Sequence, residues 1–289
     1  MQFTMAIAMT DPTHYAALAR TAEEVGFAQV AVPDSIFWSE QVSDSYPYTA
    51  DGARMWTQDT PFVDPFVAVG AMASVTERIR FCTHVIKVAV RNPVLLAKQV
   101  QSAAVLSGGR FTFGAGVGWL KEEFEWCGQV YEGRGRYTDE SLEAVLAILS
   151  GDWAEMSGER VSFGRIRMAP APPSQVPVYI GGHTPIALRR TVRFGQGWTS
   201  AMMGYDEAKA VITELSSMLE AAGRSTDGFT FQLASSDRFG LDGYRDLASI
   251  GVTDIVTIPW LFYGVPLDGP LEAKQDGIRQ FAADVIQKW

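Results

Sequence analysis

The sequence predicts an α/β fold, a single (β/α)8 TIM barrel over residues 1–289. Short apolar runs alternate with longer segments of helical period along the whole chain. Eight of the short runs qualify as strands, and no shift in composition marks a boundary between domains. Eight strands that alternate with about eight helices favour a closed barrel over an open doubly wound sheet.

The strand candidates are continuously apolar and lack period-2 alternation. This is the pattern of strands covered on both faces, by helices outside and by a packed interior. In chain order they are residues 3–9, 28–34, 80–87, 111–118, 176–182, 197–203, 229–236 and 254–259.

The helix candidates have apolar residues at three- and four-residue steps, as an amphipathic helix requires. The spacing is clear in residues 15–25, 142–149, 208–219 and 278–286. Pro65, Pro93 and Pro185 lie in the first turn of further helices, where a missing N–H costs little.

Two connections are too long to be plain turns, and loops beyond about 15 residues are usually functional or disordered. Residues 35–62 follow the carboxyl end of the second strand, where barrels place their sites, and are rich in aromatic side chains. We expect this segment to be a lid. Its Phe37 and Trp38, with Trp260 after the last strand, are the expected substrate contacts.

The second long connection, residues 151–175, precedes the fifth strand. It contains three prolines and a possible hairpin, with residues 153–156 against residues 161–163. We expect an insertion on the outside of the barrel.

Composition excludes several classes of protein. A formal charge of -9 argues against binding to nucleic acid or to an anionic membrane, since both need clustered cations. The two cysteines, Cys82 and Cys127, form neither a disulfide framework nor a CxxC metal motif. No apolar run approaches the roughly 20 residues of a membrane span, and no leader is visible. We therefore expect a cytoplasmic protein without a metal.

Three glycines at every second position, Gly114, Gly116 and Gly118, end the fourth strand and precede Trp119. They do not spell GxGxxG, so a dinucleotide fold is disfavoured. Two interpretations remain open. The glycines either make room in a crowded barrel interior or let a ligand approach the bare backbone.

The fifth strand ends in Gly181 and Gly182, and His183 and Thr184 lead into a helix. Free N–H groups at a helix start bind phosphate without charged side chains, and barrels often bind phosphate late in the chain. The alternative is an ordinary turn with Thr184 as the helix cap.

Two further polar residues follow strands. Asp34 either contacts a cofactor or proton-handling group, or bonds the base of the lid. His84 is either catalytic or a core histidine satisfied by a neighbour. No metal-ligand spacing and no GxSxG nucleophile motif occur, so hydrolysis on this barrel is disfavoured.

Several stretches together resemble the luciferase-like flavin and deazaflavin oxidoreductases, the superfamily of bacterial luciferase and of enzymes dependent on coenzyme F420. The most specific is Gly114-Ala-Gly-Val-Gly-Trp-Leu-Lys-Glu-Glu-Phe124. The others, in the family's order, are residues 19–27, 30–34, 64–66, 76–83, 91–93, 108–111, 133–136, 177–182 and 195–198.

The resemblance implies a barrel that binds an isoalloxazine or deazaisoalloxazine ring at its carboxyl face. His84-Val85 matches a non-prolyl cis peptide behind the ring, and Asp34 matches a polar position near its edge. The expected cofactor contacts are Asp34, Thr83, His84, Val85, Gly116, Val117, Gly118, Trp119, Gly181, Gly182, His183 and Thr184.

This chain departs from the F420-dependent branch at one position. Several members carry Asp-His at the end of the second strand, with a proton-handling histidine, but this chain has Asp34-Ser35. The base therefore stays open between Asp34, His84, a lid residue and water, and Asp34 and His84 are the catalytic candidates.

The glycine-rich stretch resembles the F420-type subgroup more than the alkane or alkanal monooxygenases. We therefore expect an F420-dependent oxidoreductase that transfers hydride to or from a small organic substrate with an apolar part. An FMN-dependent monooxygenase and a non-catalytic flavin or deazaflavin carrier are the alternatives. Homodimers are common in this family, so a homodimer is expected.

Overall fold

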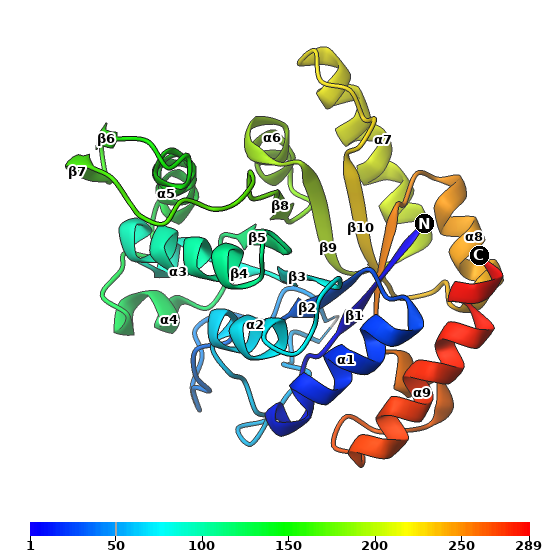
Figure 1. Cartoon of the computed structure of the whole chain (residues 1–289). Coiled ribbons are helices and arrows are strands. Elements are labelled where there is room, and N and C mark those ends of the chain that lie inside the picture. The colour runs from blue at the N-terminus through cyan, green and yellow to red at the C-terminus, as the bar shows by residue number, and fades with distance from the viewer. Residues whose placement is uncertain (50) are drawn as a thin grey trace.

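The computed structural model describes residues 1–49 and 51–289, and its centre is a closed barrel of eight parallel strands (Figure 1). The eight predicted strands are all present. They are β1 (Gln2–Ala6), β2 (Gln29–Val32), β3 (Arg80–Thr83) with β4 (Ile86–Lys87), β5 (Phe111–Gly116), β8 (Val178–Gly181), β9 (Gly197–Met203), β10 (Thr230–Ser235) and β11 (Asp254–Thr257).

The barrel closes because its first and last strands pair. Met5 of β1 lies beside Thr257 of β11, and every neighbouring pair around the barrel is parallel. The third predicted strand is divided by a cis peptide bond between His84 and Val85, as the resemblance implied. Both of its parts, β3 and β4, pair with β5.

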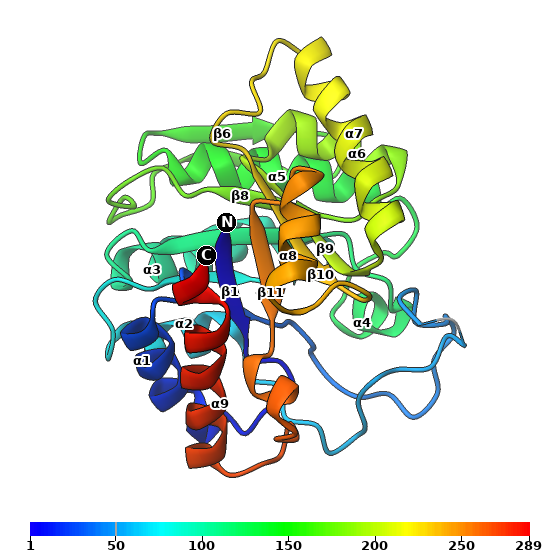
Figure 2. The ribbon, with the colours of Figure 1, turned by 90° about the vertical axis from the view of Figure 1, so that its right-hand side faces the viewer.

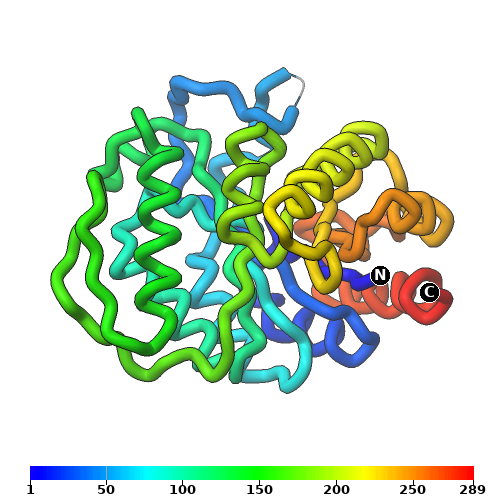
Figure 3. The backbone as a smooth tube through the Cα atoms, turned by 90° about the horizontal axis from the view of Figure 1, so that it is seen from above, coloured from blue at the N-terminus to red at the C-terminus, as the bar shows by residue number. Residues whose placement is uncertain are grey.

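Helices surround the barrel, as the tube seen from above shows (Figure 3). Prolines begin three of them, and the residue before each proline caps the helix: Asp64, Asn92 and Thr184 accept hydrogen bonds from backbone N–H groups of the first turn. The helices are α1 (Tyr15–Val25), α2 (Pro65–Ala73), α3 (Pro93–Leu106), α4 (Lys121–Trp126), α5 (Arg134–Leu149), α6 (Pro185–Phe194), α7 (Tyr205–Ala221), α8 (Gly240–Ser249) and α9 (Leu271–Asp284).

The two long connections differ in structure. Residues 151–175 contain the expected antiparallel hairpin, β6 (Ala154–Ser157) with β7 (Ser162–Ile166), outside the barrel. The described residues of segment 35–62 form neither helix nor strand, and this segment projects on the side of α4 (Figure 2). Residue 50, which falls within the expected lid, lies outside the described residues.

The core fills the barrel and the space beneath the helices. Its largest buried side chains include Trp198, Phe81, Phe111 and Phe281. Fully burying such side chains stabilises the fold by roughly 1.5–3 kcal/mol each. The chain ends lie close together, since the rings of Phe3 and Trp289 have centroids 6.0 Å apart.

Candidate active site

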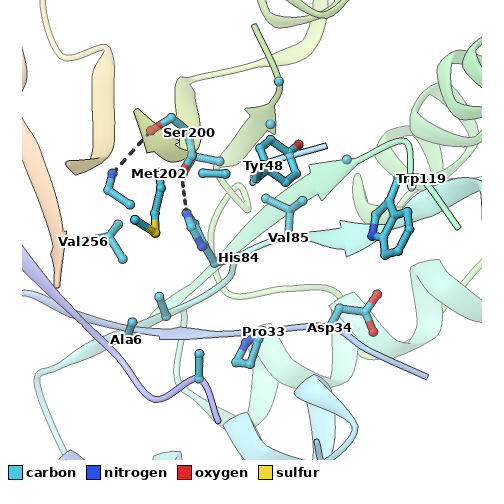
Figure 4. Close-up of a pocket in the computed structure, with 18 of the residues that line it drawn as sticks. Ala6, Pro33, Asp34, Tyr48, His84, Val85, Trp119, Ser200, Met202 and Val256 are labelled. Carbon is cyan, nitrogen blue, oxygen red and sulfur yellow. Dashed lines mark hydrogen bonds between the residues drawn. The ribbon is translucent and has the colours of Figure 1, made fainter. Parts of the chain in front are cut away.

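A cavity of about 940 Å³ opens at the carboxyl ends of the barrel strands (Figure 4). Residues from the ends of all eight barrel strands or the loops after them line it, together with the lid and the starts of α5 and α6. Ligand pockets in proteins have volumes of about 300–1,000 Å³, so this cavity lies at the upper end of that range.

The alternating glycines make room for the interrupted strand. A Cβ at Gly114 would lie 1.7 Å from the carbonyl oxygen of Thr83, and the Thr83 hydroxyl donates to the Gly114 carbonyl at 2.8 Å. Gly114 and Thr83 are buried and do not line the cavity. The crowded-interior interpretation is therefore correct for Gly114.

Val85 projects between two glycines. If Gly116 of β5 carried a Cβ, that atom would lie 2.6 Å from the side chain of Val85. A Cβ on Gly181 of β8 would lie 3.3 Å from the same side chain. A side chain at either position would therefore displace Val85. Val85, Gly116 and Gly181 all line the cavity. The result is an apolar bulge flanked by bare backbone, and this surface suits a flat ring.

His84 is partly buried beside this bulge and lines the cavity. One of its ring nitrogens, Nε2, lies 3.0 Å from the carbonyl oxygen of Ser200 (Figure 4). Burial lowers the pKa of His84, and the Ser200 carbonyl offsets part of the effect. The imidazole is therefore neutral near pH 7, and since a carbonyl only accepts, Nε2 is its donor nitrogen.

Asp34 is held in an ion pair. The guanidinium of Arg91 donates to both of its carboxylate oxygens at 2.7 Å, and the amide of Lys87 donates to one of them at 3.0 Å. The Asp34 side chain is only 1% exposed. With three donors on two oxygens, Asp34 is better placed to fix the strand end than to accept a proton from a ligand.

A second buried ion pair lines the cavity. The ammonium of Lys87 donates to both carboxylate oxygens of Glu123 on α4, and one of these oxygens also accepts from the amide of Ile36 at 3.2 Å. Glu122, the neighbouring residue, accepts from the amide of Ser43 at 2.8 Å. Two adjacent carboxylates of α4 thus hold the first part of segment 35–62.

The start of α6 forms the polar end of the cavity. Gly182 (φ +111°) and Thr184 line it, as do Arg134 and Arg190. Arg134 lies 3.7 Å above the ring of Tyr131, and Arg190 is largely buried. A helix start and guanidinium groups are both features of phosphate sites, although Arg190 is also paired with Asp139. Thr184 also caps α6, so the two interpretations of this turn are compatible.

The described residues of segment 35–62 supply aromatic walls. The ring of Tyr46 contacts those of Trp56 and Trp119 edge to face, with centroids 5.0 and 5.3 Å apart. Tyr46, Tyr48 and Trp56 line the cavity, as Phe37 does. Burial raises the pKa of Tyr46 to about 12, so this phenol stays protonated and neutral.

Comparison with known proteins identifies the family. A family model described as luciferase-like monooxygenase matches residues 2–236. The chain belongs to the luciferase-like monooxygenase family. An uncharacterized protein of Mycobacterium tuberculosis is 37% identical over 291 residues and is matched over 100% of both chains.

Two solved structures of this barrel fold have similar shapes. The coenzyme F420 dependent tetrahydromethanopterin reductase from Methanopyrus kandleri has a TM-score of 0.76 and 17% identity, with 99% of both chains covered. The monooxygenase RslO1 from Streptomyces bottropensis also has a TM-score of 0.76 and 17% identity, with 100% of this chain and 99% of that one covered. At this identity the likeness shows the fold alone.

The structure brings most of the expected luciferase-like site residues into one cavity. Lining it are Asp34, Phe37, His84, Val85, Gly116, Val117, Gly118, Trp119, Gly181, Gly182 and Thr184. Outside the lining are Trp38, Thr83, His183 and Trp260.

The two tryptophans lie elsewhere for visible reasons. Trp38 packs under Arg54, whose guanidinium lies 3.2 Å from the centre of its ring. Trp260 is fully buried against α9, where Gly277 leaves room for it. Its neighbours Leu261 and Phe262 line the cavity instead.

Sequence reasoning missed four charged residues that lie in the site or pair with residues that line it: Lys87, Arg91, Glu123 and Arg134. Three of the four lie in stretches that carry the family resemblance, so a signal was present for Arg91, Glu123 and Arg134. Their pairing could not be read from the chain, because Lys87 and Glu123 are 36 residues apart.

No group of three or more potential metal ligands occurs among residues 1–49 and 51–289. Within the same residues, no helix has the length and apolarity to cross a membrane.

Proposed function

We propose that this protein is a coenzyme F420-dependent oxidoreductase that transfers hydride between the deazaflavin and an organic substrate with an apolar part. One observation carries the proposal. A single cavity joins the bulge at Val85 to the cationic start of α6, which are the two ends that a ring-and-phosphate cofactor needs.

The residues present fit such a cofactor. Val85, Gly116 and Gly118 would hold the ring, with Thr83 supporting them from behind and Val117 and Trp119 beside them. Gly181, Gly182 and Thr184 would hold the phosphate, with His183 at the exposed edge. Bound there, a deazaflavin supplies or takes up a hydride at one ring carbon.

Arginines at the phosphate end support F420 over FMN. Besides Arg134 and Arg190, the guanidinium of Arg136 comes within 3.8 Å of where a Cβ of the cavity-lining Gly133 would lie. F420 carries carboxylates beyond its phosphate, and FMN does not. Because Arg190 is paired with Asp139, Arg134 and Arg136 are the guanidinium groups at this end that suit the larger anion.

The chain's own residues position the substrate and exclude water. His84 would act as a neutral hydrogen-bonding group, and Asp34 as the anion that orients Arg91 and the start of β4. If the substrate is an alcohol, the deazaflavin would supply the hydride acceptor, and the hydroxyl proton would pass to water. We assign that proton to water because both cavity carboxylates, Asp34 and Glu123, are already in ion pairs.

A titration of the purified protein with F420 and with FMN tests the proposal. We expect F420 to bind with a micromolar or lower dissociation constant. The double variant Arg134→Ala with Arg136→Ala should weaken the binding of F420 more than the binding of FMN. Binding of FMN alone, with oxygen consumption when the FMN is reduced, would establish the monooxygenase alternative. Binding without turnover of any alcohol, aldehyde or enone would favour a carrier.

A further inference from the structure

The cavity is divided by charge. Every charged side chain that lines it, from Asp34 to Arg190, lies between positions 34 and 190. The lining contributed by β1, by Ala31 of β2, by β9, β10 and β11, and by the segments after β10 and β11 carries none. We call this second part the apolar half. It is separate from the proposed phosphate site, which lies at the start of α6.

The floor of the apolar half is made of small side chains. Ala6, Ala31 and Ala234, from three different strands, line the cavity around Val256 and pack together above Cys82. We call these three residues the alanine floor. Figure 4 shows Ala6 and Val256 on one side of His84, with Asp34 and Trp119 on the other. Small residues here leave space that larger side chains would fill.

The outer edge of the apolar half is also apolar. Met202, Phe239, Leu261 and Phe262 line the cavity and are 42–52% exposed. The rings of Phe239 and Phe262 lie 5.9 Å apart, so they form one continuous surface. Exposed apolar patches of this kind mark binding sites, and this one continues the lining outward from the alanine floor.

The polar groups within the apolar half are neutral hydroxyls. Ser235, Thr257 and Tyr244 line it, and burial raises the pKa of Tyr244 to about 12. Such groups can pair with a carbonyl or hydroxyl, but they cannot compensate the burial of a charge.

We propose that the apolar half binds an uncharged substrate whose hydrocarbon body extends from the alanine floor past Phe239 to solvent, with a carbonyl or hydroxyl at its inner, reacting end. This inference rests on the proposed function, because the reacting end must meet the cofactor held in the charged half. It adds that the substrate is neutral at that end and that its hydrocarbon body reaches the half-exposed outer edge.

Calorimetric titration with unbranched 2-alkanones, from butanone to decanone, tests the inference on cofactor-loaded and on cofactor-free protein. Each added methylene should tighten binding about fourfold until the chain passes Phe239. 2-Oxodecanoate, which adds a carboxylate beside the same carbonyl, should bind at least about tenfold more weakly than 2-decanone.

Two variants locate the binding. Ala234→Leu should weaken the binding of 2-decanone at least about tenfold and leave the cofactor affinity unchanged. Ala71→Leu, on the exposed face of α2, is the control and should change neither affinity. Phe239→Ser should weaken the binding of 2-decanone and leave the binding of butanone unchanged. Because Phe239 is half-exposed, this variant keeps its fold, which its melting temperature checks.

The outcomes separate the two proposals. Failure to bind F420 and FMN overturns the proposed function, and the alkanone series on cofactor-free protein still decides the present inference. A flat chain-length series, equal binding of 2-oxodecanoate, or undiminished binding by Ala234→Leu overturns the inference even if the cofactor binds.

Discussion

The sequence predicts where Asp34 lies but not which residue it pairs with. The sequence places it at the end of β2, where both a cofactor contact and a bond to the lid base were open. In the structure its carboxylate meets Arg91, 57 positions later, and the amide of Lys87. The position follows from the strand pattern, whereas the partner depends on how two separate loops fold over the barrel.

Removing Asp34 should be costly, because the Arg91 guanidinium, whose side chain is only 15% exposed, would lose its anion. We expect Asp34→Ala to lower the free energy of unfolding by about 3–5 kcal/mol. The matched control is Asp242→Ala, which breaks the exposed pair of Asp242 with Arg245 and should cost less than about 1 kcal/mol. Urea unfolding measures both, and equal losses would contradict a structural role for Asp34.

His84 predicts a pH dependence. Its pKa in the folded protein is lowered by burial, while in the unfolded chain it is about 6.5. Between the two values the unfolded chain binds more protons, so the stability due to neutral His84 falls as the pH drops below about 6.5. The slope reaches at most about 1.4 kcal/mol per pH unit.

His84→Gln, which keeps a donor for the Ser200 carbonyl, should remove this part of the dependence. Urea unfolding between about pH 7.5 and 5 should show the wild type losing more stability toward acid than the variant. Parallel curves for the two proteins would mean that His84 is protonated equally in the folded and unfolded states.

At the scale of elements, apolar runs and helical spacing were sufficient to find the strands, because burial on both faces leaves a strong pattern. The division of the third strand into β3 and β4 has no such pattern and came only from the family resemblance. The alternating glycines of β5 are its trace in the sequence. These glycines are needed because the carbonyl of Thr83 and the side chain of Val85 leave no room for a Cβ, and both groups belong to the neighbouring, divided strand.

The fit between β3 and β5 can be tested with one methyl group. Gly114→Ala would place its Cβ against the Thr83 carbonyl, so we expect a loss of more than about 3 kcal/mol or failure to fold. Gly70→Ala is the control, because no atom lies within 4 Å of its Cβ position in α2. It should gain about 0.5–1 kcal/mol. Thermal unfolding distinguishes these results, and a stable Gly114→Ala protein would show that β3 and β5 can separate.

At the scale of the whole molecule, the sequence placed the site at the carboxyl face because all barrels of this class use it. The division of the cavity into charged and apolar halves was not predicted. It arises because the ring of strands brings β1 beside β11, so residues from the two ends of the chain form one wall opposite the middle of the chain.

The outer surface predicts how two copies of the chain associate. Val67 of α2 and Leu95 of α3 are 65% and 67% exposed, and the two helices pack against each other. Each of these residues lies in the first turns of its helix, on the same side of the barrel as the strand ends that carry the cavity. Exposed apolar side chains on adjacent helices are typical of an interface, so we predict a homodimer through α2 and α3.

Sedimentation velocity at equal concentrations tests this interface. The wild type should sediment at twice its chain mass of 31.6 kDa, and the double variant Val67→Glu with Leu95→Glu should sediment as a monomer. Val130→Glu, which adds charge at an exposed apolar residue outside these helices, should remain a dimer. A wild type that sediments as a monomer, or a double variant that stays dimeric, would exclude this face as the interface.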